Sequence, residues 1–403
     1  MRVAFLTHEP FHPPSGGGSA EAPYLVREFV RRGHAVDLFC PAFPDSDAVA
    51  RQFGVTVHPF TRWRMGRYAR FRNLKYLLYP TALARLVRST PARFDVLVAQ
   101  HTISAVAAGR LRRELGIPAV LNFLDYLTGF METWPAWVMP RPMVRRLTRF
   151  ELSLPRRYDV EGILTVSRPL ADRFITTGYP EERVRAIQYG YDASRFQPAS
   201  EGLPPQSPVV VMHGSFDQHH LGQIALDTVS RIATARPEVG FRFVGRETPS
   251  LSRFVQRLRA SVPGVRLELP GFIPYDAVAG QVRSATVGLV PYEESNGTHC
   301  AFVAKAVEYL GCGIPVASTP LENLRTYFAD ESAMRFGRFD GESLAAVVLS
   351  WLDLPAPDRV RLGRAASARV AAALDWSVVT SRAVDFVEAR TRAAAPVSRI
   401  AHE

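Results

Sequence analysis

The sequence has few cysteines, no long apolar run and almost no lysine. Its three cysteines, Cys40, Cys300 and Cys312, are odd in number and lack the paired spacing of zinc ligands. We therefore expect buried free thiols rather than a disulfide framework or a structural metal site. No apolar run approaches the ~20 residues that a membrane-spanning helix needs, and the first residues read as a short strand rather than a signal peptide. These absences favour a cytoplasmic protein.

Arginine supplies nearly all of the positive charge. The formal net charge is +11, and lysine occurs only at Lys75 and Lys305. Excess positive charge favours anionic partners such as nucleotide sugars, phospholipid surfaces or nucleic acid, without choosing among them. Because no nucleic-acid-binding module is recognisable, we expect no nucleic-acid partner.

The length and the pattern of apolar residues predict two α/β domains. A chain of 403 residues with 47% hydrophobic content is expected to form two domains of roughly 200 residues each. Short β-branched runs alternate with helix-like segments, as in parallel α/β sheets. The expected strands are residues 3–6, 36–39, 55–57, 96–99, 119–123 and 163–166, and then 209–212, 241–244, 265–269, 287–290 and 315–317.

Three prolines in the stretch GLPPQSP interrupt the alternation and indicate an interdomain linker. We expect an N-terminal, acceptor-side Rossmann-like domain over 1–201 and a linker over 202–208. A C-terminal, donor-side Rossmann-like domain over 209–375 and a helix and tail over 376–403 follow. Because ligands of doubly wound sheets bind at the carboxyl ends of the strands, we expect the site in a cleft that both domains face.

A glycine-rich loop, PPSGGGSAE, lies between the first expected strand and a helix. Gly16, Gly17 and Gly18 let backbone N–H groups approach a ligand, and a helix N-terminus favours negative charge. The loop is no dinucleotide fingerprint, because Glu21 stands where the third glycine belongs and the loop starts about ten residues after the strand. A nicotinamide dehydrogenase is thus disfavoured, and a merely flexible loop remains the alternative.

A second motif, YEESNGTHCAFVAKAVEYLGCGIPVAST, begins at Tyr292. Its composition predicts a helix over 301–310, with residues 295–299 at the helix N-terminus. Lys305 and Glu308 share one face of this helix, and a cation and a carboxylate so placed suit a pyrophosphate and a ribose diol. By spacing alone, an ordinary surface ion pair is the alternative.

The run KAVEYLGCGIPVAST resembles the donor-binding signature of GT-B glycosyltransferases of the glycogen-synthase and bacterial lipid-mannosyltransferase type. Further similar segments follow in the family's order over nearly the whole chain: PSGGGSAEAPYLVREFVRRGHAVDLFCP, GILTVSRPLADRFITTGYP, VRAIQYGYDASRFQP, VMHGSF, FRFVGRE, LELPGFIPYDAV and VGLVPYEES. The resemblance implies a GT-B fold of two Rossmann-like, doubly wound parallel-sheet domains. It also implies transfer of a sugar from a nucleotide-diphosphate donor, UDP- or GDP-linked, to a hydroxyl acceptor, with no cofactor.

The resemblance also implies roles for individual residues. Glu308 would bind the donor ribose, Lys305 would lie near the diphosphate, and the three glycines of the first loop would approach the diphosphate or the sugar. The remaining donor-binding residues implied are Gly271, Phe272 and Ile273 at the base, together with His213, Gly214, Arg246, Tyr292, Asn296 and Gly297. For His213 a buried core histidine is the alternative.

The chain departs from the retaining members of the family at Cys300, where they carry a glutamate eight positions before the ribose glutamate. The stereochemical outcome is therefore open, and similar inverting, membrane-associated glucuronosyltransferases show the same gap. An inverting enzyme needs a general base at the acceptor hydroxyl. Asp125 and His101, each directly after an expected strand, are the candidates, with His8 and Glu9 as further ones. A helix cap is the alternative role for Asp125.

No metal site is expected. Asp45 and Asp47 form the Asp-x-Asp pattern of GT-A enzymes, but they lie in a loop remote in sequence from the donor signature. The charge of the leaving group would then be met by Lys305, arginines such as Arg246 and a helix dipole.

Two segments, 60–80 and 131–157, interleave arginines with aromatic residues. Such segments suit an anionic membrane surface, so a lipid-linked acceptor and a peripheral location at the inner face of the membrane are one expectation. The alternative expectation is that both segments are ordinary solvated helices and that the acceptor is a small molecule. Two different functions also remain open: a sugar-nucleotide epimerase or hydrolase of the same shape, and a catalytically degenerate binding subunit.

Overall fold

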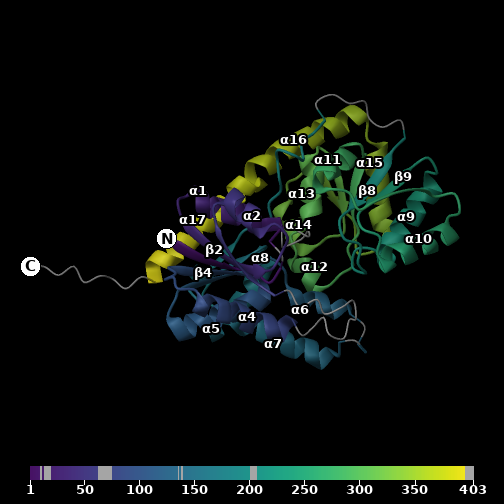
Figure 1. Cartoon of the computed structure of the whole chain (residues 1–403). Coiled ribbons are helices and arrows are strands. Elements are labelled where there is room, and N and C mark those ends of the chain that lie inside the picture. The colour runs from purple at the N-terminus through teal and green to yellow at the C-terminus, as the bar shows by residue number, and fades with distance from the viewer. Residues whose placement is uncertain are drawn as a thin grey trace, which may run out of the picture. The chain divides into compact units, whose positions relative to one another are not determined.

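A computed structural model describes residues 1–9, 11–12, 20–61, 75–134, 136–137, 139–199 and 207–394. The chain divides into two compact units, Met1–Gln188 with Val379–Glu403, and Tyr189–Val378 (Figure 1). The end of the chain therefore belongs with the N-terminal unit. Most of the expected linker, and the glycines of the first loop, lie outside the described residues.

The first unit is built on a seven-stranded parallel sheet in the order β3-β2-β1-β4-β5-β6-β7. Its strands are β1 Arg2–Leu6, β2 Ala35–Pro41, β3 Thr56–Phe60, β4 Val96–Gln100, β5 Ala119–Phe123, β6 Gly162–Thr165 and β7 Val184–Ala186. Its helices are α1 Glu21–Arg31, α2 Ser46–Phe53, α4 Lys75–Ser89, α5 His101–Leu115, α6 Leu127–Phe130, α7 Arg141–Arg157 and α8 Arg168–Thr176, with short 3-10 turns at Met131–Thr133 and Glu181–Arg183. Figure 1 shows α4 and α5 on one side of this sheet and α1 and α17 on the other. Strands covered on both faces explain the continuous apolar runs in the sequence.

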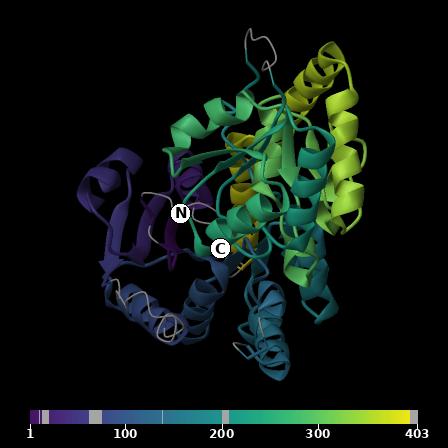
Figure 2. The same cartoon turned by 90° about the vertical axis from the view of Figure 1, so that its right-hand side faces the viewer.

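The second unit is built on a six-stranded parallel sheet in the order β10-β9-β8-β11-β12-β13. Its strands are β8 Val209–His213, β9 Gly240–Val244, β10 Arg266–Gly271, β11 Val287–Val290, β12 Val316–Ser318 and β13 Met334–Phe336. Its helices are α9 Gln223–Ala235, α10 Pro249–Ser261, α11 Tyr275–Arg283, α12 Asn296–Cys300, α13 Ala304–Gly311, α14 Glu322–Tyr327, α15 Gly341–Asp353 and α16 Ala356–Leu374. Figure 2 shows helices on both faces of this sheet as well. The predicted pair of doubly wound parallel sheets is confirmed.

The strand orders place a ligand-binding edge in each sheet. In the first sheet the order reverses between β1 and β4, and in the second between β8 and β11. Ligands of such sheets bind outside the carboxyl ends of the strands at this reversal. Residues that directly follow these four strands are therefore the first candidates for chemistry.

Two sequence expectations about local structure were incomplete. The strands β7 and β13 are three residues long and lie at sheet edges, where short apolar runs leave little pattern. The helix expected over 301–310 begins only at Ala304, because α12 intervenes. Ser295 caps α12 by a reciprocal pair of hydrogen bonds with Thr298, and extended backbone at Ala301 and Val303 separates the two helices.

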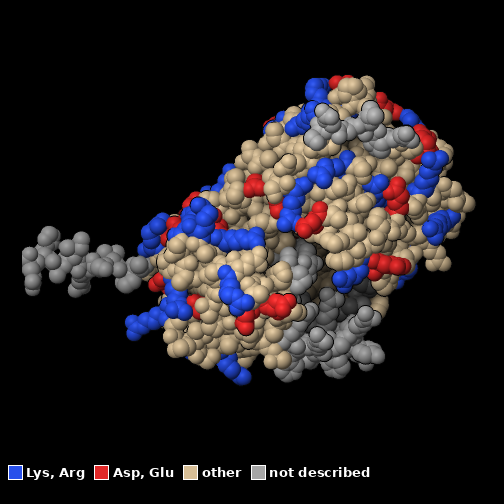
Figure 3. All heavy atoms as spheres, turned by 45° about the horizontal axis from the view of Figure 1, so that its top comes forward, with Lys and Arg blue, Asp and Glu red and all other residues tan. Residues whose placement is uncertain are grey.

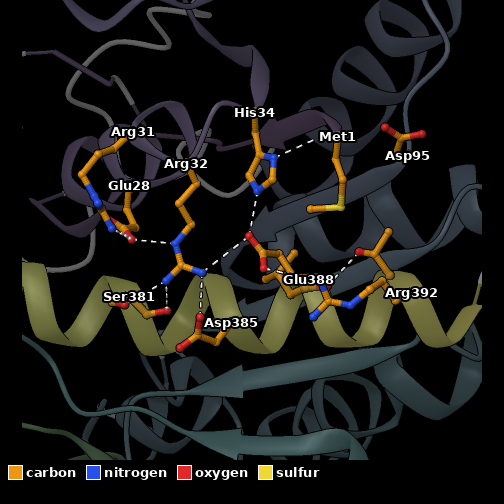
Figure 4. Close-up of polar contacts among 12 residues, drawn as sticks. Met1, Glu28, Arg31, Arg32, His34, Asp95, Ser381, Asp385, Glu388 and Arg392 are labelled. Carbon is orange, nitrogen blue, oxygen red and sulfur yellow. Dashed lines mark hydrogen bonds and ion pairs between the residues drawn. The ribbon is translucent and has the colours of Figure 1, made fainter.

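The last helix, α17 Trp376–Ala394, is tied to the N-terminal elements by polar contacts (Figure 4). Arg32, which follows α1, donates to Asp385 at 2.6 Å and to the Ser381 hydroxyl at 2.8 Å. His34 Nε2 lies 2.8 Å from Glu388. These partly buried contacts explain why residues from Val379 onward belong to the first unit.

The cysteines and the charged surface are as the composition predicts. Cys40, Cys300 and Cys312 are buried and free, as expected. On the face drawn in Figure 3, basic and acidic side chains are interspersed. Among the described residues, no helix is long and apolar enough to cross a membrane.

Candidate active site

The second sheet brings five of the predicted donor-binding residues together at its strand-order reversal. His213 ends β8, Gly214 follows it, and Tyr292 comes two residues after β11. Helix α13 supplies the other two residues. Its Glu308 Oε2 lies 2.5 Å from His213 Nε2, and its Lys305 Nζ donates to the Tyr292 hydroxyl at 3.0 Å.

Glu308 is a buried carboxylate held by two donors. Its side chain retains 9% of its exposure, and its second oxygen, Oε1, accepts a hydrogen bond of 2.8 Å from the Tyr275 hydroxyl. An ionised carboxylate offers about four acceptor positions, so both contacts leave capacity for a diol. His213 is itself 5% exposed, so it is a buried histidine whose contact holds the Glu308 carboxylate in place.

Lys305 passes directly over Gly214. The backbone of Gly214 has φ +104°, and a Cβ placed there would lie 2.6 Å from Lys305 Cε. A side chain at this position would be both strained and in collision with the lysine stem. Glycine at position 214 therefore makes room for the ammonium group, whose Nζ lies 5.6 Å from the centre of the Tyr292 ring.

Two histidines that the sequence analysis did not single out lie beside this lysine. The rings of His219 and His220 have centroids 3.9 Å apart, and both pack against Tyr292. Burial, reinforced by the charge of Lys305, lowers the pKa of His219 to about 4 and that of His220 well below its ordinary value. Both imidazoles are thus neutral near pH 7. The signal for them was a histidine pair in the loop directly after an expected strand.

Asp217, His219 and His220 also offer ligand atoms within 4.8 Å of one another. This group is where a cation would be held if the protein bound one. His220 Nδ1, however, accepts a hydrogen bond from the backbone N–H of Asp217, with 3.3 Å between the two nitrogens. The positive charge of Lys305, which already lowers the pKa of both histidines, acts against a cation there.

The residues predicted to hold the base lie at the same edge of the sheet. Gly271 ends β10, and its carbonyl accepts a hydrogen bond of 3.0 Å from the N–H of Gly245. The Arg246 guanidinium lies 5.3 Å from the centre of the Phe272 ring, which is 71% exposed. Together with the partly exposed Ile273, they offer a flat surface on which a planar base can stack.

Asn296 and Gly297 form the first turn of α12, in the segment that follows β11. They therefore lie on the same side of the sheet as Tyr292. Gly16, Gly17 and Gly18 lie outside the described residues.

In the first sheet, two histidines flank the reversal between β1 and β4. His101 directly follows β4 and has φ +61°, which is uncommon for a residue other than glycine. Its ring lies 5.4 Å from that of His8, which comes two residues after β1, in an edge-to-face arrangement. Such an outlier at a strand end is typical of functional sites.

Asp125 lies two residues after β5, and the pKa of its carboxylate is raised. Desolvation by the surrounding protein atoms raises the pKa of Asp125 to about 7, and the negative charges of Glu9 and Glu151 act in the same direction. The side chain nevertheless keeps solvent access, as a group that exchanges a proton with a bound molecule requires. It does not cap α6, because Glu151 Oε2 accepts from the N–H of Thr128 at 3.0 Å and Glu151 also accepts from the N–H of Leu127.

Glu21 is a further buried carboxylate that the sequence analysis did not assign to the site. It opens α1, and its Oε2 accepts from Gln100 Nε2 at 2.8 Å and from Asn122 Nδ2 at 2.7 Å. Burial raises the pKa of Glu21 to about 7. The contacts fix the start of α1 to the ends of β4 and β5.

Two family models match this chain. One of Glycosyltransferase Family 4 matches residues 15–195, and one of Glycosyl transferases group 1 matches residues 207–353. The two matches together span most of both units. The protein is therefore a glycosyltransferase of GT-B fold, and the predicted class of enzyme is confirmed.

Known proteins of this kind are similar over most of the chain. A D-inositol 3-phosphate glycosyltransferase of Thermobispora bispora is 25% identical over 321 residues, which cover 75% of this chain and 72% of the relative. Sucrose-phosphate synthase from Thermosynechococcus elongatus has a similar fold, with TM-score 0.75, 17% identity and coverage of 97% and 99%. Anabaena Alr3699/HepE in complex with UDP and glucose gives TM-score 0.70 and 16% identity over 96% of this chain and 99% of that one.

Proposed function

We propose that the second unit binds a UDP-sugar and that the enzyme transfers its sugar to a hydroxyl group. The observation that carries the proposal is the meeting of Lys305 and Glu308 at the strand-order reversal between β8 and β11. Glu308 accepts from the ribose diol, and Lys305 lies at the diphosphate. The backbone of residues 271–273 and the side chains of Arg246 and Phe272 hold the base. Solved structures of Anabaena HepE with UDP and UDP-glucose support the choice of nucleotide.

Departure of the nucleotide proceeds without a metal in this proposal. The bond between the anomeric carbon and the phosphate oxygen breaks, and its electron pair goes to the diphosphate. Lys305 stabilises the negative charge of the diphosphate as a preorganised cation at the carboxyl edge of the sheet. The neutral imidazoles of His219 and His220 donate or accept hydrogen bonds around it without adding a competing positive charge.

Asp125 is the proposed general base for an inverting transfer. The acceptor oxygen forms the new bond to the anomeric carbon, and its proton moves to the Asp125 carboxylate. A pKa near 7 suits a base that works at neutral pH. His101, with its left-handed backbone, is the second proposed catalytic group at this edge. The acceptor is a lipid-linked or small-molecule hydroxyl compound, and the relative named for D-inositol 3-phosphate is consistent with a polyol.

A thermal-shift screen tests the donor proposal. A ligand at a concentration 100 times its Kd stabilises the folded protein by about 2.7 kcal/mol. UDP and UDP-sugars should raise the melting temperature more than GDP, ADP and their sugars at equal concentration. No shift with any nucleotide would contradict the proposed donor site. Conversion of a UDP-sugar into an equilibrium mixture with its epimer, without acceptor, would instead indicate an epimerase, a function for which a fold neighbour, a UDP-N-acetylglucosamine 2-epimerase of Listeria monocytogenes, is named.

A further inference from the structure

Helix α7 has a packed half and an uncovered half. In the packed half, the Glu151 carboxylate accepts from the hydroxyls of Thr102 and Thr128, each at 2.6 Å, and Leu152 and Leu154 are buried. Over residues 141–150, Val144 alone is buried. The helix is therefore anchored at one end, and its N-terminal half presents side chains to solvent.

Apolar side chains project from this uncovered half. Trp137, just before the helix, is 86% exposed, Met143 is 52% exposed and Phe150 is 38% exposed. Met143 and Phe150 are seven residues apart and so lie on one side of the helix, two turns from each other. A single exposed apolar residue is ordinary, but these three lie along one short element.

Unpaired arginines lie among these apolar side chains. Arg146 is three residues from Met143 and four from Phe150, which places it on the same side of the helix. With Arg145 and Arg149 it is exposed, and none of the three forms an ion pair with any residue that the structure describes. The acidic residue of α7, Glu151, is buried, so every charged side chain that this half-helix exposes is an arginine.

We propose that this surface, made of Trp137, Met143, Arg145, Arg146, Arg149 and Phe150, binds an anionic phospholipid bilayer. Arginines beside exposed tryptophan and phenylalanine are what a helix lying in the membrane interface requires. The ring of Trp137 and the side chains of Met143 and Phe150 enter the interface, while the arginines pair with lipid phosphates. The other arginine and aromatic segment, 60–80, falls largely outside the described residues.

Three buried hydrophobic residues support the surface from beneath. Val144 packs with Met131 and Met139 in a buried cluster, against which Trp134 and Leu147 also pack. This cluster fixes the uncovered half to the unit, so that binding at α7 would hold the whole unit at the membrane.

Vesicle sedimentation tests the proposal with the full chain and needs no nucleotide sugar, so it is independent of the proposed function. The vesicles contain phosphatidylglycerol and phosphatidylcholine, or phosphatidylcholine alone. The wild type should sediment with the anionic vesicles at low salt, and much less at high salt, since screening shortens the reach of the charges. The triple variant Arg145→Ser, Arg146→Ser, Arg149→Ser should bind about 100-fold more weakly, from the contribution of each basic residue near a membrane.

A matched control separates this surface from general positive charge. Arg253, Arg257 and Arg259 are exposed on α10, and their replacement by serine removes the same charge. Vesicle binding should change less than about twofold in this variant, because these residues lie outside the proposed surface.

The double variant Trp137→Ser, Met143→Ser should also weaken binding by about fivefold or more, since it removes apolar surface from the interface. Equal losses in the two arginine variants, no effect of the apolar variant, or no wild-type binding at low salt would each overturn the proposal. An apolar variant that binds as the wild type does would indicate a site for a soluble polyanion such as nucleic acid. Melting temperatures equal to the wild type's show that the variants are folded.

Discussion

Replacing Gly214 by alanine tests how the lysine of the donor site is positioned. The new Cβ would lie 2.6 Å from Lys305 Cε and 3.2 Å from Nζ. The first distance is shorter than non-bonded atoms allow, and the second is tighter than most real contacts. The lysine side chain is the flexible partner in this collision, so we expect it to move and its ammonium group to leave the Tyr292 hydroxyl.

Two effects of different origin follow from this change. Alanine at φ +104° is strained by about 1 to 3 kcal/mol, and this cost lowers the stability of the protein. Displacement of Lys305 would also remove the charge-assisted contact that we propose with the diphosphate, worth about 1.5 to 3 kcal/mol. Donor affinity should therefore fall by about 10- to 150-fold.

Two other glycines separate the strain from the collision. Gly116 has φ +69° and no atom within 4 Å of the point that a Cβ would occupy, and Gly264 has neither a positive φ nor a close neighbour. Gly116→Ala should lower the melting temperature and leave UDP binding unchanged, and Gly264→Ala should change neither. Calorimetric titration with UDP and thermal unfolding measure both quantities. Wild-type affinity for UDP in a folded Gly214→Ala variant would refute the assigned position of Lys305.

The remaining predictions concern charge and protonation. Glu308→Gln and Lys305→Met should each weaken UDP binding by about 10-fold or more, whereas Glu294→Gln, at a residue 61% exposed, should not; equal effects in calorimetry would contradict the site. Turnover should survive a chelator, and its loss with recovery on adding manganese or magnesium would contradict departure of the nucleotide without a metal. For Asp125, whose raised pKa is about 7, the carboxylate form prevails only above that pH. The pH profile of kcat/KM should therefore fall below about pH 7, and Asp125→Asn should lose about 10²- to 10⁴-fold in rate while still binding UDP. Glu21 has a folded-state pKa of about 7 against an ordinary 4.5. Its contribution to stability is thus complete below about pH 4.5 and is lost as the pH rises through about 7, by about 3 kcal/mol in all. Glu21→Gln should flatten this part of the curve of unfolding free energy against pH, and an unchanged slope would show that Glu21 is not its source.

The strands could be predicted from the sequence because most of them are covered on both faces. A strand such as β5, with all five residues buried, leaves an uninterrupted apolar run that needs no knowledge of its partners. β13 has three residues, two of them only partly buried, and no comparable run. The break between α12 and α13 was missed for another reason: it depends on the Ser295 and Thr298 cap, which competes locally with a helix that propensity alone favours.

Most residues of the candidate site were named from the sequence, but the contacts between them were not. Lys305 and Glu308 belong to a motif with a recognisable spacing, whereas the partners of Glu308 come from β8 and from α11. Tyr275 carries no sequence signal that links it to a residue 33 positions away. His219 and His220 are adjacent in sequence and lie in the loop after a strand, so a search for paired histidines near strand ends would have found them.

The geometry around Lys305 explains why this position carries a lysine in a chain that otherwise uses arginine. Arginine serves as the cation almost everywhere in this chain, since lysine stands only at positions 75 and 305. At 305 the side chain must pass over the backbone of Gly214 and end at the hydroxyl of Tyr292, beside the partly buried imidazole of His219 and the buried one of His220. A narrow aliphatic stem with a compact ammonium group fits this path, whereas a planar guanidinium is wider and carries its charge over several atoms. A compact charge also concentrates the field on one phosphate oxygen, which is the need of a leaving diphosphate when no metal takes part.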